Sequence, residues 1–357
     1  MKDIFINFDS PALANNAMFK DDINNMNDPW KFLRDRFLEL GYTFKTIDQN
    51  SLDNCTCVIF MDGSSLGEKL KYPLSNIPFL RKETLKKKPE PKRKLYQECL
   101  HHGLKDKMVL VLWEGKSVKP YNYVKSLHDK FSTILTWNDE LVDNKKFFKF
   151  RLPIPDRKPL GTVVPFSQKK LLVNISFNKY SREKNELYSE RRKSIEYFDS
   201  NFPDNFDLYG VRWNIPITRL QRIFPWFIKK YKTYRGHSKD KIETLSKYKF
   251  NICYENLSGT NGYITEKIFD SLQAGTVPVY WGAPNITDYI DSDTFIDRRK
   301  FNNNTELAKY LIKMKEGEYN KYILAGKRYL TSDKYIQFLP KSFCNRVIEI
   351  LKLKHII

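Results

Sequence analysis

Two blocks of alternating strand and helix patterns, separated by a proline-rich tract, constrain the fold of this chain more than any other feature. In the first block, short apolar runs typical of strands alternate with apolar residues at helical spacing. The strand-like runs are residues 2–8, 42–47, 57–63 and 107–115, and the helical patterns are residues 29–40 and 95–104. Strands that alternate with helices in this way form parallel α/β layers.

The tract at residues 151–165, RLPIPDRKPLGTVVP, holds four prolines and has no hydrophobic period, so we place the domain boundary in it. The alternation then restarts, with strands expected at residues 169–177, 206–211, 250–256 and 277–282, and helices at residues 185–202, around 240–248, after 264 and over most of 305–351. The predicted domains are residues 1–160 and 161–357, and whether the last helices pack back on the first domain stays open. The predicted fold class is α/β, with two Rossmann-like domains that face a central cleft.

The formal net charge of the 357 residues is +20. Such a surface attracts the phosphates of nucleic acids, lipid headgroups or nucleotide-bearing substrates, although the general abundance of Lys, Asn and Ile weakens the case for nucleic acid. The basic stretch at residues 82–94 is predicted to be a solvated linker, with contact to a membrane or an acceptor as the alternative. We find no membrane-spanning run and no signal peptide. Together with an odd count of five cysteines, this favours reduced thiols in the cytoplasm.

Residues 253–284, CYENLSGTNGYITEKIFDSLQAGTVPVYWGAP, contain a short amphipathic helix between two loops. Ile264, Ile268 and Leu272 recur at every fourth position, so one stripe of the helix is expected to pack inward. Gly275 suits the position after the helix, where the backbone turns left-handed. The glycines of the preceding loop allow a ligand to approach the backbone closely.

The start of this helix predicts a phosphate site. Free N–H groups and the positive end of the helix dipole favour an anion there, and Lys267 would add a point charge to a diphosphate. Glu266 cannot serve a phosphate, but it could accept hydrogen bonds from ribose hydroxyls. The alternative is that Glu266 only complements the dipole and that Lys267 is solvated.

The segment from Phe250 to Ile286 resembles the donor-binding signature of the α1,3/α1,4-fucosyltransferases, glycosyltransferase family 10, including its bacterial members. The similar residues are FNICYEN, then YITEKIFD, then TVPVYWGAPNI, with weaker similarity over residues 174–198 and 209–213. The resemblance implies a GT-B type fold and a GDP-fucose donor held by the C-terminal domain. No tightly bound cofactor and no divalent metal are implied to be required, and whether a metal stimulates the reaction stays open. The D-x-D at Asp291–Asp293 is interpreted as incidental.

The resemblance also implies roles for individual residues. Asn256, Tyr263, Glu266 and Lys267 match donor-contacting positions, with Glu266 on the ribose, Lys267 on the phosphates and Tyr263 on the nucleotide or sugar face. An arginine of the helix at residues 185–202 is expected on the diphosphate, because a bidentate guanidinium suits phosphate oxygens better than a lysine does. Of the two neighbours Arg191 and Arg192, we favour Arg191.

Glu114, at the end of the apolar run MVLVLW, is the predicted catalytic base. Inversion by direct displacement needs a group that takes the acceptor hydroxyl proton, and the family places a glutamate at a matching strand end. The alternatives are that Glu114 caps the strand or pairs with a lysine, and the other candidate acids are Asp139, Glu140 and Asp62.

The predicted function is inverting transfer of L-fucose from GDP-β-L-fucose to a GlcNAc or Glc hydroxyl, α1,3 or α1,4, of a lactosamine- or lactose-type glycan. The acceptor is a free or lipid-linked oligosaccharide, such as a lipopolysaccharide that carries Lewis-type antigens. The alternative is a GT-B transferase for another GDP-sugar or acceptor, and a polyanion-binding protein is a weaker one; no nucleic-acid motif is found. We expect a cytoplasmic protein. The basic, tyrosine-rich stretch at residues 309–335 is predicted to form helices that pack back on the domains, with peripheral contact to an anionic membrane as the alternative.

Overall fold

A computed structural model describes residues 1–22, 25–48, 50–67, 93–157 and 164–357. The chain divides into two compact units, Met1–Arg151 together with Pro340–Ile357, and Leu152–Leu339. The predicted boundary between residues 160 and 161, and nearly all of the basic stretch at residues 82–94, lie outside the described residues. No described helix is long and apolar enough to cross a bilayer.

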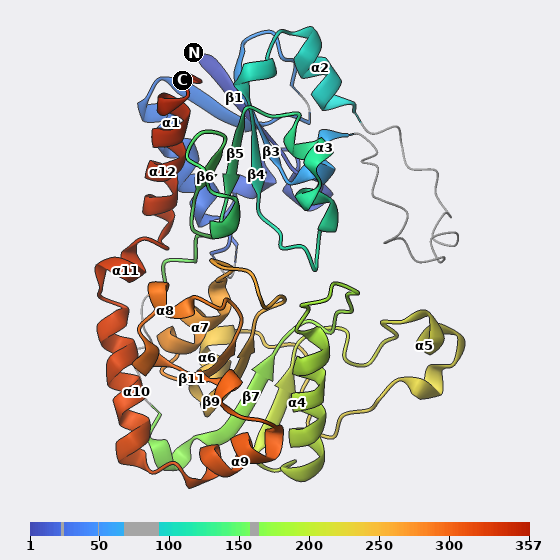
Figure 1. Ribbon diagram of the computed structural model, residues 1–357, viewed down its shortest axis with the longest axis vertical. Coiled ribbons are helices and arrows are strands. Elements are labelled where there is room, and N and C mark those ends of the chain that lie inside the picture. The colour runs from blue at the N-terminus through green and yellow to red at the C-terminus, as the bar shows by residue number, and fades with distance from the viewer. Residues whose placement is uncertain (23–24, 49, 68–92, 158–163) are drawn as a thin grey trace. The chain divides into compact units, whose positions relative to one another are not determined.

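The first unit is built on a parallel sheet of six strands in the order β2-β1-β3-β4-β5-β6 (Figure 1). Its strands are β1 Lys2–Asn7, β2 Tyr42–Thr46, β3 Cys55–Met61, β4 Met108–Leu112, β5 Thr133–Thr136 and β6 Phe147–Lys149. Its helices are α1 Asp28–Glu39, α2 Leu95–His101, α3 Lys125–His128 and α12 Pro340–Leu353. Every residue of β4 is buried, as a central parallel strand requires.

The last helix, α12, belongs to the first unit although it is the end of the chain. Its Phe343 packs against the rings of Trp30 of α1, Trp113 and Phe150, with centroids 5.6–6.0 Å apart. Large aromatic side chains bury much apolar surface, so this cluster holds α12 against the first sheet. The unit boundary therefore differs from the predicted ranges, which assigned residues 340–357 to the second domain.

The second unit has a parallel sheet of five strands in the order β11-β10-β9-β7-β8. Its strands are β7 Lys170–Ile175, β8 Phe206–Tyr209, β9 Tyr248–Tyr254, β10 Val277–Trp281 and β11 Ile296–Asp297. Its helices are α4 Tyr188–Asn201, α5 Arg219–Ile223, α6 Lys241–Ser246, α7 Glu266–Gln273, α8 Ile286–Tyr289, α9 Asn304–Lys313, α10 Glu316–Tyr329 and α11 Asp333–Ile336. The predicted inward stripe of α7, Ile264, Ile268 and Leu272, is confirmed, because all three are buried in one core cluster.

Both sheets have a strand order that reverses next to the first strand of the unit. In the second unit β7 lies between β8 and β9, so the chain winds in one direction from β7 to β8 and in the other from β9 onward. In sheets of this kind, ligands bind outside the carboxyl ends of the strands at the reversal point. The carboxyl ends of β7 and β9 are therefore where a site is expected.

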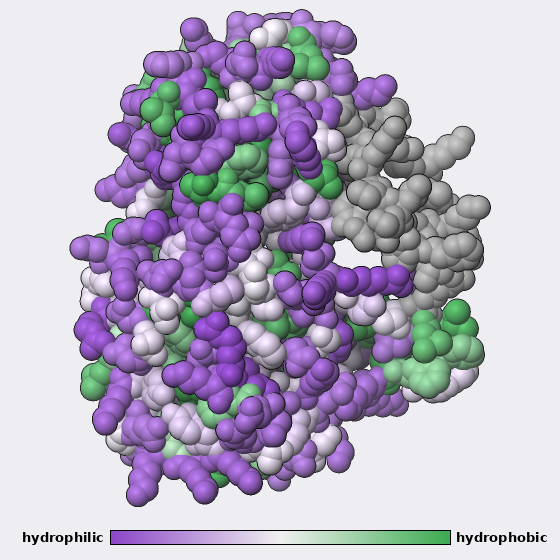
Figure 2. Space-filling model, viewed as in Figure 1, coloured by the Kyte–Doolittle hydropathy of each residue, from purple (hydrophilic) through white to green (hydrophobic). Residues whose placement is uncertain are grey.

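Figure 2 shows a mostly hydrophilic surface with an apolar cluster over α5, a short helix that Figure 1 shows standing out from the rest of its unit. The sequence patterns did not predict α5, nor the short strands β5 and β6. Three to five residues are too few to show a hydrophobic period.

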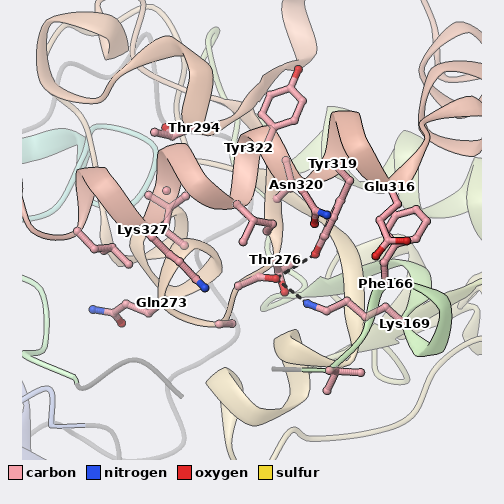
Figure 3. Close-up of a pocket in the computed structure, with 18 of the residues that line it drawn as sticks. Phe166, Lys169, Gln273, Thr276, Thr294, Glu316, Tyr319, Asn320, Tyr322 and Lys327 are labelled. Carbon is pink, nitrogen blue, oxygen red and sulfur yellow. Dashed lines mark hydrogen bonds between the residues drawn. The ribbon is translucent and has the colours of Figure 1, made fainter. Parts of the chain in front are cut away.

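A cavity of about 680 Å³ lies at the opposite edge of the second sheet, beside the amino ends of β7 and β10. Mostly apolar side chains line it, together with Lys169, whose ammonium donates a hydrogen bond to the Gly275 carbonyl at 2.6 Å, as does the Tyr319 hydroxyl at 3.1 Å (Figure 3). The Gly275 backbone is left-handed, at φ 64°, as predicted for the end of α7. Burial lowers the pKa of Lys169 to about 8, because the interior disfavours the charged amine.

Lys169→Met should change how stability depends on pH. The folded pKa of about 8 lies below the ordinary 10.5, so between these values the unfolded chain binds more protons and the wild type gains stability as pH rises. The Met variant lacks this gain, which is at most about 1.4 kcal/mol per pH unit. Urea unfolding of both proteins between pH 7.5 and 10.5 measures the difference, with the exposed Lys321→Met as control. If the free energy of unfolding changed with pH in the same way for the wild type and Lys169→Met, the lowered pKa of Lys169 would be contradicted.

Candidate active site

The predicted donor-contacting residues lie around the carboxyl ends of β7 and β9, at the reversal point of the second sheet. β9 ends at Tyr254, and Glu255 and Asn256 follow directly. The loop after them leads back to α7, whose first residues are Glu266 and Lys267. One continuous segment of chain therefore supplies both sides of the site.

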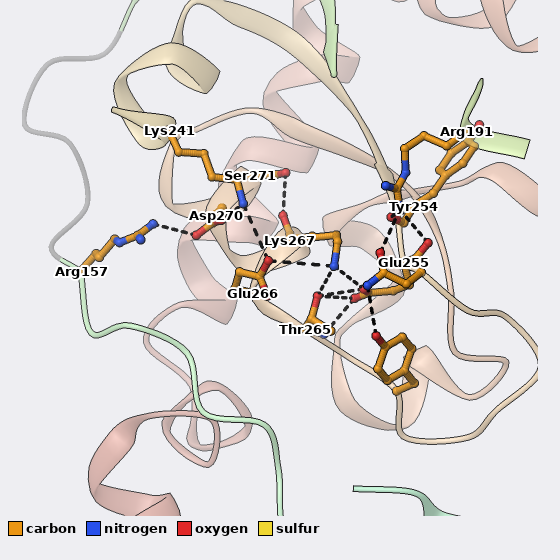
Figure 4. A network of polar contacts seen from close by, with 12 residues as sticks. Arg157, Arg191, Lys241, Tyr254, Glu255, Thr265, Glu266, Lys267, Asp270 and Ser271 are labelled. Atoms are coloured by element: carbon orange, nitrogen blue, oxygen red, sulfur yellow. Dashed lines mark hydrogen bonds and ion pairs between the residues drawn. The ribbon is translucent and has the colours of Figure 1, made fainter. Parts of the chain in front are cut away.

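Glu255 is the centre of the site and is fully buried. One carboxylate oxygen accepts hydrogen bonds from the Thr265 N–H at 2.8 Å and the Thr265 hydroxyl at 3.0 Å. The other accepts from the same hydroxyl at 2.8 Å and from Lys267 at 2.9 Å (Figure 4). A buried carboxylate needs partners of this kind, so Glu255 ties the end of β9 to the start of α7.

Gly282, which directly follows β10, lies very close to the Glu255 carboxylate. A Cβ placed on Gly282 would lie 2.6 Å from Cγ of Glu255, which is closer than real side chains allow. The Glu255 N–H also donates to the Trp281 carbonyl at 2.8 Å. The glycine of the YWGAP segment is therefore required by packing against Glu255.

Lys267 is shared between two carboxylates. Its ammonium lies 2.9 Å from Glu255 and 4.0 Å from Glu266. Burial opposes the charged form of Lys267, but Glu255 and Glu266 outweigh it and raise its pKa. Burial likewise opposes ionisation of Glu266, whose pKa falls to about 2 because Lys267 and Lys241 lie beside it. Both side chains are therefore charged at neutral pH, and both keep part of their surface exposed to a ligand.

The structure separates the two arginines that the sequence left open. Arg191 is buried and donates through Nη2 to the carbonyl oxygens of Tyr254 at 2.6 Å and Glu255 at 2.8 Å. It also donates to the Asn256 side chain at 3.4 Å. Arg192 turns away and donates to the Lys179 carbonyl. The predicted preference for Arg191 therefore agrees with its place beside the other predicted residues.

Asn256 and Tyr263 complete the group. The Asn256 amide donates to the Tyr263 hydroxyl at 3.5 Å, and Tyr263 is buried. The loop between them turns at Gly259 and Gly262, whose φ angles of 71° and 81° lie in the left-handed region that favours glycine. All five predicted donor residues of the second unit are thus brought together, around the end of β9.

A second cluster of charges, which sequence reasoning missed, continues the network along α7. Asp270 is buried, with Arg157 at 2.8 Å and Lys241 of α6 in direct ion-pair contact. Lys241 also lies 3.9 Å from Glu266. Burial opposes the charge of Lys241, yet Asp270 and Glu266 raise its pKa. These residues are far apart in sequence, and only the packing of α6 on α7 brings them together.

A narrow cavity of about 10 Å³, room for about one water molecule, lies at the centre of these groups. Its lining includes Asn174 and Ser176 at the end of β7, and three cationic side chains, Arg191, Lys241 and Lys267. Three cations at the carboxyl ends of parallel strands form an environment that favours an anion such as a phosphate.

Glu114, the predicted base, belongs to the first unit and follows β4 by two residues. β4 ends at Leu112, so the prediction that Glu114 itself ends the strand is corrected. The turn that carries it is held by the buried Asp62, whose Oδ1 accepts the N–H groups of Trp113 at 2.8 Å and Glu114 at 3.1 Å. Asp62 also pairs with Lys119 at 3.1 Å. Asp62, one of the alternative acids, is therefore a structural anchor for the backbone of Glu114.

Three other acids of the sequence analysis are paired. Asp139 forms an ion pair with Lys149, while Asp291 and Asp293 pair with Lys334 at 2.8 Å and Arg328 at 2.6 Å. Among the residues that the structure describes, no three His, Cys, Asp or Glu side chains are grouped to hold a metal ion.

Glu255→Gln should destabilise the protein by about 3–5 kcal/mol, because it leaves the Lys267 ammonium without its buried counter-ion. Glu266→Gln is the matched control. Glu266 keeps 31% of its side chain exposed and lies 4.0 Å from Lys267, so its loss should cost about 1 kcal/mol or less. The urea midpoint of tryptophan fluorescence measures both variants, and equal midpoints would show that Glu255 does not anchor the site.

In sequence, part of the chain is similar to fucosyltransferases. The sequence profile of glycosyltransferase family 10 (fucosyltransferase), C-terminal part, matches residues 216–354. A stretch of 73 residues, 20% of this chain, is 42% identical to the alpha-(1,3)-fucosyltransferase FucT of Helicobacter pylori. A stretch covering 31% of this chain is 32% identical to GDP-fucose protein O-fucosyltransferase 3 of Xenopus tropicalis. These alignments span only 15% and 28% of the two relatives.

In fold, the chain is similar to an alpha1,3-fucosyltransferase crystallised with GDP-fucose. The TM-score is 0.52 at 16% sequence identity, over 99% of this chain and 90% of that one. This likeness confirms the predicted GT-B type class, with two Rossmann-like α/β units. In sequence, residues 216–354 of this chain are similar to glycosyltransferase family 10, the fucosyltransferase family.

Proposed function

We propose that this protein is a GDP-fucose-dependent glycosyltransferase that moves L-fucose, with inversion, to a GlcNAc or Glc hydroxyl of a lactosamine- or lactose-type glycan. The observation that carries the proposal is the cluster of Arg191, Asn256, Tyr263, Glu266 and Lys267 at the reversal point of the second sheet. Four of these residues lie in the stretch that matches the family, residues 216–354, and Arg191 precedes it.

In this proposal the donor diphosphate binds near Lys267 and Arg191, and the ribose hydroxyls donate to Glu266. Because Glu266 is ionised at neutral pH, it accepts hydrogen bonds and repels a misplaced phosphate. Lys267 is balanced by buried Glu255, so the site holds a cation in place before the donor arrives. Such preorganised charge stabilises the negative charge that develops on the leaving GDP.

The chemical step is a single displacement. The acceptor hydroxyl oxygen forms the new bond to the anomeric carbon of fucose as the bond to GDP breaks. The hydroxyl proton passes to the Glu114 carboxylate, and GDP leaves with the bonding electron pair. No residue of this step requires a metal, and the proposal keeps open whether a divalent ion stimulates it.

The rival proposal keeps the donor and changes the acceptor. The similarity to a GDP-fucose protein O-fucosyltransferase, over 31% of the chain, makes a protein hydroxyl the specific alternative. Transfer from GDP-fucose and from GDP-mannose to N-acetyllactosamine, lactose and a folded protein panel separates these options. Activity with GDP-mannose alone, or no transfer to any acceptor from GDP-fucose, would overturn the proposal.

Lys267→Ala should weaken donor binding and slow transfer together, because it removes one charge-assisted contact to the diphosphate. We expect a loss of about 10²–10³ in kcat/KM for GDP-fucose. Lys241→Met, at the second cluster, is expected to have a smaller effect, since Asp270 already neutralises Lys241. Unchanged kcat and KM in Lys267→Ala would remove Lys267 from the donor site.

Glu114→Gln should lower kcat by about 10²–10⁴, the range typical of a lost general base, with little change in GDP affinity. Glu140→Gln is the matched control, because Glu140 is an exposed carboxylate of the same unit and one of the alternative bases. Transfer rates and calorimetric titration with GDP measure the two effects. A large loss of GDP affinity in Glu114→Gln, or an equal loss of kcat in Glu140→Gln, contradicts the assignment.

We also propose that the protein works in the cytoplasm, peripheral to the inner membrane, on a free or lipid-linked acceptor. The support is chemical: the net charge is +20, and anionic lipid surfaces attract basic proteins.

A further inference from the structure

An exposed apolar loop with a basic surround lies at residues 214–230, outside the proposed donor site. Its two ends are anchored: Trp213 donates to the Ser176 carbonyl at 2.8 Å, and its ring packs on Tyr231 at 5.4 Å. Between these anchors the chain leaves the core and returns, carrying α5 outward (Figure 1). Residues 214–230 therefore form a surface loop whose ends lie close together, and such loops are often functional.

The tip of this loop presents large apolar side chains to solvent. Trp226 is 73% exposed, and four neighbours are exposed as well, namely Leu220, Ile223, Phe224 and Phe227. Figure 2 shows a contiguous apolar cluster over α5, the helix from which or beside which these residues come. Soluble proteins seldom expose such a patch unless another surface covers it.

The patch is ordered by its own contacts. Thr218 and Gln221 form a capping box at the start of α5, and the ring of Trp226 lies 5.1 Å from that of Phe224. The rings of Phe224 and Phe227 pack edge to face at 6.0 Å. The apolar side chains are therefore held together before they meet a partner, which reduces the entropy lost on binding.

The segment that carries the patch has charges of one sign, although Lys229 lies 3.7 Å from Glu196 of α4 and Arg235 pairs with Asp207 of β8. No Asp or Glu occurs between Asp207 and Asp240. In the same interval the basic residues are Arg212, Arg219, Arg222, Lys229, Lys230, Lys232, Arg235 and Lys239. An acid-free, basic stretch that carries exposed aromatic and aliphatic side chains matches a surface that is anionic outside and apolar beneath.

We infer that residues 214–230 dock the protein on an anionic phospholipid bilayer, with the apolar tip in the headgroup region and the basic residues on the lipid phosphates. Tryptophan and phenylalanine at the tip suit the membrane interface. Leu220 and Ile223 suit acyl chains, whereas a nucleic acid offers them nothing to stack on.

Residues 309–335, for which membrane contact was the alternative to helices that pack on the domains, fit this role less well. In that stretch α10 turns Tyr319, Ala325, Gly326 and Tyr329 into the core. The exposed large apolar side chains of this stretch are Ile312 and Leu324, and no aromatic ring is among them. The inference goes beyond fucosyl transfer, because lipid binding needs neither donor nor acceptor.

Vesicle flotation of the full chain tests the inference. Vesicles of phosphatidylcholine alone are compared with vesicles that contain equal parts of phosphatidylcholine and phosphatidylglycerol. We expect binding to the anionic vesicles that weakens at high salt, because salt screens the basic residues. Trp226→Ser combined with Phe227→Ser should weaken this binding by at least about tenfold, since two interfacial side chains are lost.

Two matched variants separate the apolar and the charged contributions. Leu324→Ser combined with Leu353→Ser removes two exposed apolar side chains elsewhere and should leave vesicle binding unchanged. Arg222→Gln combined with Lys230→Gln should weaken binding to anionic vesicles, whereas Lys321→Gln combined with Lys352→Gln, also exposed, should weaken it less.

Several outcomes would overturn the inference. One is that the wild type fails to float with anionic vesicles, and another is that the tip variant floats as the wild type does. Tighter binding to single-stranded DNA than to anionic vesicles would make the partner a nucleic acid. A tip variant with normal flotation but a raised acceptor KM would make the loop an acceptor contact. If the protein floats but does not use GDP-fucose, the proposed function fails and the docking surface stands.

Discussion

The buried ion pair between Glu255 and Lys267 is the interaction on which the candidate site depends. It joins the carboxyl end of β9 to the first turn of α7, and the backbone N–H and hydroxyl of Thr265 complete it. Removing one charge from such a pair leaves the other uncompensated in a poorly hydrated place. The pair therefore fixes where Lys267 lies, and it keeps the lysine charged.

The charges around this pair are nearly balanced along α7. Glu255, Glu266 and Asp270 alternate in space with Lys267, Lys241 and Arg157. A balanced network can stay buried without a ligand, yet it leaves Lys267 and Glu266 partly exposed at its open end. In the proposed reaction these two groups meet the donor, one at the phosphates and one at the ribose, while the deeper pairs hold them in position.

Much of the fold was predictable because its signals are local. The strand runs at residues 2–8 and 57–63 and the helical spacing at residues 29–40 became β1, β3 and α1. The start of α7 soon after residue 264 and its end before Gly275 were predicted as well. The short β5 and β6 were missed, because such short segments show no hydrophobic period. The placement of α12 in the first unit was left open, because long-range packing leaves no local trace in the sequence.

By itself, the sequence determined the two α/β blocks, since they rest on hydrophobic periods. The donor-contacting residues, with Arg191 preferred to Arg192, stay a prediction that rests on the resemblance to a donor-binding motif. Only the tertiary structure decided that Lys267 pairs with Glu255, that Lys241 and Arg157 meet at Asp270, and that Asp62 anchors the turn of Glu114. It also decided that Trp226 and its neighbours face solvent. The reason is physical: hydrophobic period and backbone propensity are local properties, whereas burial and ion pairing depend on which distant segments the sheet brings together.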